Sequence, residues 1–154
     1  MTNEQHRRVL VVDDDSTVRG ILVTALRQRG LVVDQAEDGR EAIDLVREHS
    51  YSVVLLDLLM PVTDGFEVLK TLHGDHGLAA PVVLVVTGAD RMMIEQLDSK
   101  LIHGIVKKPF DPQEVSAVVA ACADLRGRGA FETMALATML SGAPLFAWWA
   151  SNKF

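Results

Sequence analysis

The sequence Val9-Leu10-Val11-Val12-Asp13-Asp14-Asp15 joins four consecutive apolar residues to three consecutive carboxylates. A short, branched apolar run with a polar end is typical of a strand that is buried on both faces of a parallel sheet. Four more short runs of this kind follow along the chain, and helix-length stretches separate them. This alternation predicts an α/β fold with a doubly wound, five-stranded parallel sheet.

The expected strands and helices alternate along the first 125 residues. The strands are predicted at Val9–Val12, Val32–Ala36, Val53–Leu56, Val82–Val86 and Gly104–Val106. The helices are predicted at Thr17–Arg29, Gly39–His49, Gly65–His73, Arg91–Ser99 and Pro112–Leu125. Gly30 stands where a helix end favours glycine, and Asp111 stands where a carboxylate caps a helix that starts with proline. Five such units predict one compact domain over residues 1–125.

The composition is that of a folded protein. Of the 154 residues, 49% are hydrophobic and 23% are charged, which are ordinary values for a globular domain. The formal net charge of −6 disfavours a broad nucleic-acid-binding surface, because phosphates would be repelled. A single cysteine, Cys122, excludes an internal disulfide and a zinc site built from several thiolates. No signal-peptide-like apolar segment separates the N-terminus from the first strand, so a cytoplasmic location is expected.

The chain changes character after Leu125. Arg126-Gly127-Arg128-Gly129 predicts a short linker, and residues 133–152 contain no charged side chain. Residues 126–154 are therefore interpreted as an apolar C-terminal extension. The extension could be an extra helix over about residues 131–140 that docks on this domain or on a second copy in a homodimer. It could also be a peptide that docks on a partner, or a membrane anchor, which its internal glycine and proline disfavour.

Polar side chains follow four of the expected strands. Asp13, Asp14 and Asp15 come after the first strand, and Asp57 after the third; Thr87 and Lys108 follow the fourth and the fifth. Because the carboxyl ends of parallel strands meet at one edge, where such sheets bind ligands, these groups are expected to converge. Packed carboxylates repel one another unless a cation lies among them, and hard oxygen ligands suit Mg²⁺. The pattern therefore predicts a site for magnesium and phosphate chemistry.

The same four segments resemble the receiver domain of two-component response regulators. The resemblance covers about residues 7–125 and rests on Val9–Asp15, Leu56–Gly65, Val86–Gly88 and Lys108–Phe110. It implies a flavodoxin-like fold with strand order 2-1-3-4-5. It also implies a signalling switch and not an enzyme in the usual sense, because such a chain catalyses only its own phosphorylation and dephosphorylation.

The resemblance implies a role for each strand-end residue. Asp57 would accept a phosphoryl group from a histidine kinase or a phosphotransfer protein. Thr87 and Lys108 would bind the oxygens of that group. Mg²⁺ would be held by three carboxylates and one backbone carbonyl, which belong to Asp13, Asp14, Asp57 and Leu59. The output would be contact with a downstream protein that the sequence does not name. Direct DNA binding is not expected, because the segment after the receiver is too short for a DNA-binding domain.

Three positions differ from the usual family pattern. Family members commonly carry an aromatic residue three positions before the lysine, and this chain has Ile105 there. The positions two residues beyond the acceptor and the threonine tune dephosphorylation in the family, and here they are Leu59 and Ala89. Neither side chain can hydrogen-bond an attacking water, so we expect a long-lived phosphoryl group.

A second family offers an alternative function. The spacing of Asp13, Asp15 and Thr17 also fits the signature of haloacid-dehalogenase-like phosphatases. In that alternative, Asp13 would be the nucleophile and Asp15 the general acid or base. The alternative leaves the segment around Asp57 without a role, and Asp111 with Glu114 makes a poor acidic pair after the lysine.

Overall fold

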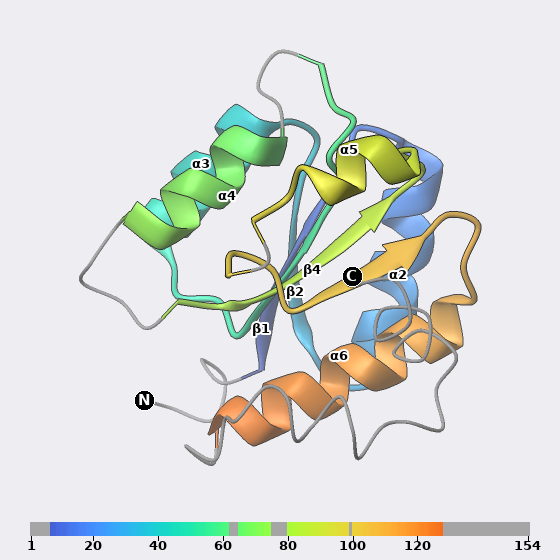
Figure 1. Ribbon diagram of the computed structural model, residues 1–154. Helices are drawn as coiled ribbons and strands as arrows, with labels where there is room; N and C mark the ends of the chain where they lie inside the picture. The colour runs from blue at the N-terminus through green and yellow to red at the C-terminus, as the bar shows by residue number, and fades with distance from the viewer. Residues whose placement is uncertain (1–6, 62–64, 75–79, 99, 128–154) are drawn as a thin grey trace.

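The computed structural model describes residues 7–61, 65–74, 80–98 and 100–127, and strands alternate with helices throughout them (Figure 1). The strands are β1 (Arg8–Val12), β2 (Val32–Ala36), β3 (Val53–Leu56), β4 (Val82–Thr87) and β5 (Gly104–Lys107). The helices are α2 (Ser16–Gln28), α3 (Gly39–Glu48), α4 (Gly65–Gly74), α5 (Arg91–Glu95) and α6 (Pro112–Gly127). In this part of the chain no helix has the length and hydropathy required to cross a bilayer.

The strands form one parallel sheet in the order β2-β1-β3-β4-β5. The predicted fold class and strand order are therefore confirmed. The connections leave β1 and β3 toward opposite faces of the sheet, and in such folds a crevice opens between these two strands. Val12 of β1 is the register partner of Leu56 of β3. The residues that follow them, Asp13 and Asp57, therefore begin their loops side by side.

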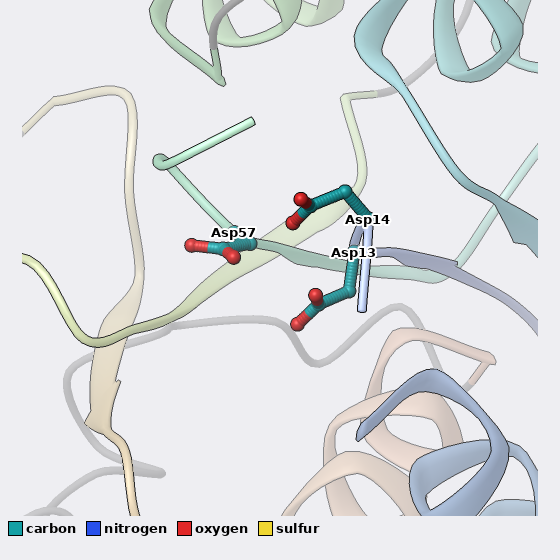
Figure 2. Close-up of side chains that lie close together, drawn as sticks. All are labelled: Asp13, Asp14 and Asp57. Carbon is teal, nitrogen blue, oxygen red and sulfur yellow. The ribbon is translucent and has the colours of Figure 1, made fainter. Parts of the chain in front are cut away.

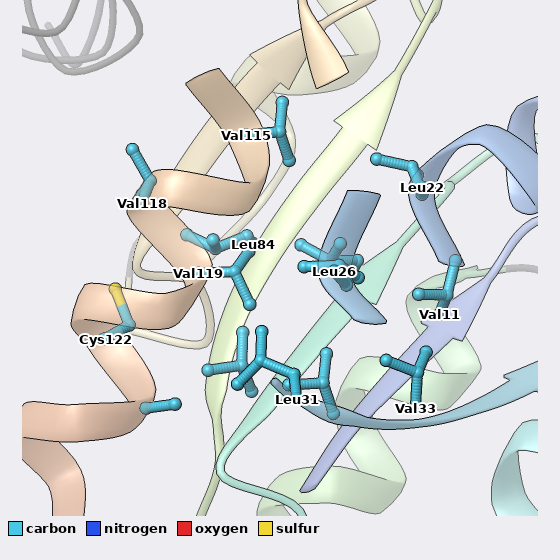
Figure 3. Close-up of a cluster of buried hydrophobic side chains, with 14 of the residues drawn as sticks. Val11, Leu22, Leu26, Leu31, Val33, Leu84, Val115, Val118, Val119 and Cys122 are labelled. Carbon is cyan, nitrogen blue, oxygen red and sulfur yellow. The ribbon is translucent and has the colours of Figure 1, made fainter. Parts of the chain in front are cut away.

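Both faces of the sheet are covered, so most of its side chains are buried, whereas the edge strand β2 keeps Val32, Asp34 and Gln35 at least partly exposed. In β3, Val53 and Leu55 face one apolar layer, whereas Val54 and Leu56 face the other. Helices α2 and α6 complete the first layer, and α3 and α4 complete the second (Figure 1). Figure 3 shows the first layer, which includes Cys122 of α6. Burial raises the pKa of the Cys122 thiol to about 12.

The predicted helix ends carry the capping contacts that their residue types favour. Gly30 follows α2 with a φ of 75°, and its N–H donates to the Arg27 carbonyl at 2.9 Å. Leu31 N–H closes the same turn on the Leu26 carbonyl at 3.4 Å. Only glycine adopts this positive φ without strain, which explains its position after the helix. At α6, Asp111 Oδ1 accepts from Gln113 N–H at 2.8 Å, as a capping residue should.

The helix predicted at Arg91–Ser99 is shorter in the structure, because α5 ends at Glu95. After α5, Gln96 N–H donates to the carbonyl three residues back, at 3.2 Å, and tightens the last turn. Asp98 Oδ1 then accepts from Lys100 N–H at 2.9 Å. Such local side-chain bonds compete with helix continuation.

Helix α6 extends to Gly127, so the first two residues of the predicted linker are helical. The remaining predictions for the C-terminal extension, including the extra helix, the anchor and the docking peptide, concern residues 128–154. Those residues lie outside the described part of the chain.

Candidate functional site

Three of the predicted site residues lie together where β1 and β3 end (Figure 2). One carboxylate oxygen from each of Asp13, Asp14 and Asp57 lies within 4.8 Å of the others. Asp13 is 2% exposed and Asp57 is 4% exposed, whereas Asp14 is exposed to solvent. The cluster therefore has a buried floor of two carboxylates and a third carboxylate at its mouth.

Lys108 joins the two buried carboxylates. Its Nζ donates to Asp13 Oδ2 at 2.7 Å and to Asp57 Oδ2 at 3.1 Å. The backbone N–H of Lys108 donates to the carbonyl of Thr87 at 3.0 Å, so the loop after β5 is held against the end of β4. Burial alone would lower the pKa of Lys108, but its hydrogen bonds to both carboxylates outweigh that effect and raise the pKa.

The other oxygen of Asp57 is contacted from two further loops. Asp57 Oδ1 accepts from Thr87 Oγ1 at 3.0 Å and from Leu59 N–H at 3.0 Å. Thr87 is fully buried, and its Oγ1 accepts from Ala89 N–H at 3.2 Å. Because this N–H occupies a lone pair of the hydroxyl oxygen, the hydroxyl proton is directed toward Asp57. Both oxygens of Asp57 are thus contacted by donors.

The three consecutive aspartates in the loop after β1 make different contacts. Asp13 Oδ1 accepts from Asp15 N–H at 2.9 Å. Burial raises the pKa of Asp13, although its contacts with Lys108 and with that N–H oppose the shift. Asp15 Oδ1 caps α2 by accepting from Thr17 N–H at 2.9 Å and from Val18 N–H at 3.2 Å. Asp15 is therefore engaged as a helix cap, as its residue type and position favour.

The charges of the cluster suit a divalent cation. Among the described residues, Lys108 is the one cationic side chain that contacts the cluster, and it contacts Asp13 and Asp57 only, so three carboxylates are accompanied by a single ammonium group. The ligand set is all oxygen, and one of its members faces solvent, which suits an ion that keeps several waters. The residues present therefore fit Mg²⁺. The backbone carbonyl of Leu59 remains a predicted ligand at the same edge.

Two contributors to this region were not predicted from the sequence. Arg19 of α2 donates from Nη1 to the carbonyl of Asp13 at 2.7 Å. The side chains of a helix tilt toward its N-terminus, so the position of Arg19 in the first turns of α2 could have indicated that it reaches the loop before the helix. Gly65, the first residue of α4, packs so closely that a Cβ there would lie 2.7 Å from the Asp57 carbonyl oxygen. Only the three-dimensional packing reveals that contact.

Gly65→Ala is expected to lower the unfolding free energy by about 2 kcal/mol, because backbone at Asp57 and Leu58 would have to shift. Urea unfolding measures this effect. Gly20→Ala is the matched control, because no atom other than the adjacent backbone of α2 and the two neighbouring residues lies within 4 Å of a Cβ at that site. It should raise stability by about 0.5–1 kcal/mol. Equal stabilities for the two variants would contradict the tight contact.

Ile105, which occupies the position that is often aromatic in the family, lies on β5. It is 8% exposed and packs in the apolar layer on the α3 and α4 side of the sheet. The structure therefore places a buried aliphatic residue at this position.

Comparisons with known proteins agree on one family. The family described as "Response regulator receiver domain" matches residues 9–120. The chain is 36% identical over 121 residues to the transcriptional regulatory protein ResD of Bacillus subtilis, covering 78% of this chain and 48% of ResD. It is 34% identical over 132 residues to the probable transcriptional regulator ycf27 of Guillardia theta, covering 84% of this chain and 50% of that protein. The chain spans about half the length of these curated relatives.

Solved structures show the same likeness. The response regulator TrrA of Thermotoga maritima, solved in complex with Mg(2+)-BeF, superimposes with a TM-score of 0.66 at 28% identity. That match covers 75% of this chain and 98% of TrrA. A CheY-like receiver domain from Methanospirillum hungatei superimposes with a TM-score of 0.70 at 21% identity, covering 80% of this chain and 98% of that domain. This second likeness supports the fold alone.

Proposed function

The chain belongs to the response-regulator receiver family, and on this premise we propose that it is a Mg²⁺-dependent phosphorylation switch whose acceptor is Asp57. The observation that carries the proposal is the set of donors around this carboxylate. Lys108 contacts one oxygen and Thr87 the other, and both come from loops at the same edge of the sheet. The proposal concerns the receiver domain that we place at residues 1–125. It assigns no role to residues 126–154.

The proposed reaction is in-line phosphoryl transfer from a phosphohistidine on a histidine kinase or phosphotransfer protein. A carboxylate oxygen of Asp57 attacks the phosphorus while the bond from phosphorus to the imidazole nitrogen breaks. That nitrogen keeps the electron pair and then takes a proton, and Asp57 becomes an acyl phosphate. Catalysis of this kind depends mainly on position and charge. Position comes from the three donors that orient the carboxylate, namely Leu59 N–H, Thr87 and Lys108. Positive charge comes from the Lys108 ammonium group.

Magnesium would be held by Asp13, Asp14, Asp57 and the backbone carbonyl of Leu59. The close approach of the three carboxylates supports this ligand set. The presence of Mg(2+)-BeF in the TrrA complex supports the choice of metal. When bound, the ion would neutralise charge on the phosphoryl oxygens as they approach the carboxylates.

Signalling would follow from a change of partners. A phosphoryl group brings additional negative charge and three strong acceptor oxygens to Asp57. Thr87 and Lys108 can then leave the carboxylate oxygens and bind the phosphoryl oxygens, which reshapes the loops that follow β4 and β5. The output would be a change in affinity for another protein. ResD and ycf27 are named as transcriptional regulators, and that function is not carried over to this chain, which matches about half of each.

The proposal predicts a phosphoryl group that persists for minutes or longer once the donor is removed. Leu59 is 45% exposed beside the acceptor, and Ala89 is buried next to Thr87. Both side chains are hydrocarbons without a donor or an acceptor, so neither can hydrogen-bond an attacking water. The chain would be phosphorylated with acetyl phosphate and Mg²⁺, desalted, and followed by intact-mass spectrometry. EDTA added before the donor should prevent the reaction.

Leu59→Gln should hydrolyse the phosphoryl group about tenfold faster, because its amide can orient water. Leu59→Met is the matched control and should behave as the parent protein does. Decay of the parent protein within seconds in buffered Mg²⁺ would contradict the expected lifetime. Failure to gain any phosphoryl group would contradict the proposed function itself.

A further inference from the structure

The three carboxylates of the cluster are held very unequally. Asp13 accepts from Lys108 and from Asp15 N–H, and Asp57 accepts from Lys108, Thr87 and Leu59 N–H. The exposed side chain of Asp14 makes no hydrogen bond with residues 7–61, 65–74, 80–98 and 100–127. The direction in which this side chain leaves the chain, its Cα–Cβ bond, is set by the backbone that carries it.

Arg19 holds that backbone. Its Nη1 donates to the carbonyl oxygen of Asp13 at 2.7 Å, and its Nε donates to Gln35 Oε1 at 3.1 Å. The Asp13 carbonyl belongs to the peptide group that joins Asp13 to Asp14, so this contact fixes the plane from which Asp14 projects. On the other side of Asp13, its N–H donates to the Ala36 carbonyl at 3.1 Å.

Arg19 thus connects three parts of the molecule. It lies one helical turn beyond Asp15, and its own N–H donates to the Asp15 carbonyl at 2.9 Å in the first turn of α2. Its guanidinium then reaches back to the acidic loop and across to β2. A guanidinium presents several donors in a fixed plane, so it can hold two acceptors at once.

We propose that Arg19 is a positioning residue that orients Asp14 for binding a divalent cation. The inference rests on the proposed function of the same site. Charge alone predicts the opposite effect of removing Arg19, because the loss of a positive charge near an acidic cluster strengthens cation binding. The sign of the change in metal affinity therefore separates a positioning role from a purely electrostatic one.

The test is a titration with Mn²⁺ as a probe for the magnesium site, in which the electron paramagnetic resonance signal of the free ion gives the dissociation constant. Arg19→Met keeps the apolar stem and removes the guanidinium, and it should weaken Mn²⁺ binding about tenfold. Arg19→Lys keeps the charge and one donor, and it should recover most of the affinity. Gln35→Met removes only the second partner and should weaken binding less, in the same direction.

Arg27→Met is the matched control. Arg27 lies on the same helix and also donates to a carbonyl, that of Val33 at 3.2 Å, far from the acidic loop along α2. Its loss should leave the dissociation constant for Mn²⁺ unchanged. Urea unfolding of Arg19→Met and Arg27→Met shows whether a change in Mn²⁺ affinity comes from a loss of folded protein. Unchanged or tighter binding by Arg19→Met would overturn the inference. If the parent protein itself binds no Mn²⁺, the proposed magnesium site fails as well.

Discussion

Asp57→Asn is expected to abolish phosphorylation by acetyl phosphate, with no mass increase after prolonged incubation. An amide keeps the shape of the carboxylate but lacks the anionic oxygen that attacks phosphorus. The variant should remain folded, because Lys108 keeps its contact with Asp13, and one of two adjacent buried negative charges is removed. Intact-mass spectrometry measures the phosphoryl group, and urea unfolding shows that the fold is intact.

Asp15→Asn is the matched control for this experiment. Asp15 follows Asp13 and Asp14 directly in the sequence, but its carboxylate caps α2. Asparagine caps helices about as well as aspartate does. Phosphorylation of Asp15→Asn should therefore match that of the parent protein. The phosphatase alternative predicts a different result. In that case Asp15→Asn would lose phosphatase activity, whereas Asp57→Asn would retain it. Phosphorylation of Asp57→Asn at the parent rate would remove Asp57 from the acceptor role.

Lys108→Met is expected to lower both the stability and the phosphorylation rate. In EDTA at neutral pH, the buried carboxylates of Asp13 and Asp57 lose their shared ammonium group, which should cost about 2 kcal/mol of unfolding free energy. Saturating Mg²⁺ should restore part of that loss, because the ion replaces the missing charge. Phosphorylation should slow by about 10²-fold, since a donor to the developing charge is gone. Urea unfolding with and without Mg²⁺ separates these effects.

Lys107→Met provides the comparison, because Lys107 is the exposed neighbour at the end of β5. It should change stability and rate little. If Lys108→Met were as stable as Lys107→Met in EDTA, the contacts of Lys108 with the two carboxylates would contribute nothing to folding.

The sheet could be predicted because each strand carries its own signal. Runs such as Val53–Leu56 are apolar on both faces, as the strands of a doubly covered parallel sheet are. Gly30 and Asp111 marked helix ends for local chemical reasons that the structure reproduces. The predicted C-terminal end of the helix that starts at Arg91 was wrong. Residue periodicity alone would continue this helix, but a turn at Asp98 competes with it.

The candidate site was partly predictable for a different reason. Topology brings strand ends to one edge, so the convergence of Asp13, Asp57 and Lys108 follows from their positions after strands. The contacts of Arg19 and Gly65 could not be predicted from topology. The first depends on the conformation of the long Arg19 side chain, and the second on how closely α4 approaches the loop after β3.

The burial of Cys122 makes the chain convenient for site-selective labelling. It is the sole cysteine of the sequence, it is 3% exposed, and its pKa of about 12 leaves almost no thiolate at neutral pH. Maleimide reagents should therefore leave the native protein unmodified. A cysteine introduced at Met92, which is 72% exposed on α5, would react alone. A fluorophore placed there would report directly on whether the loop after β4 moves when Asp57 is phosphorylated.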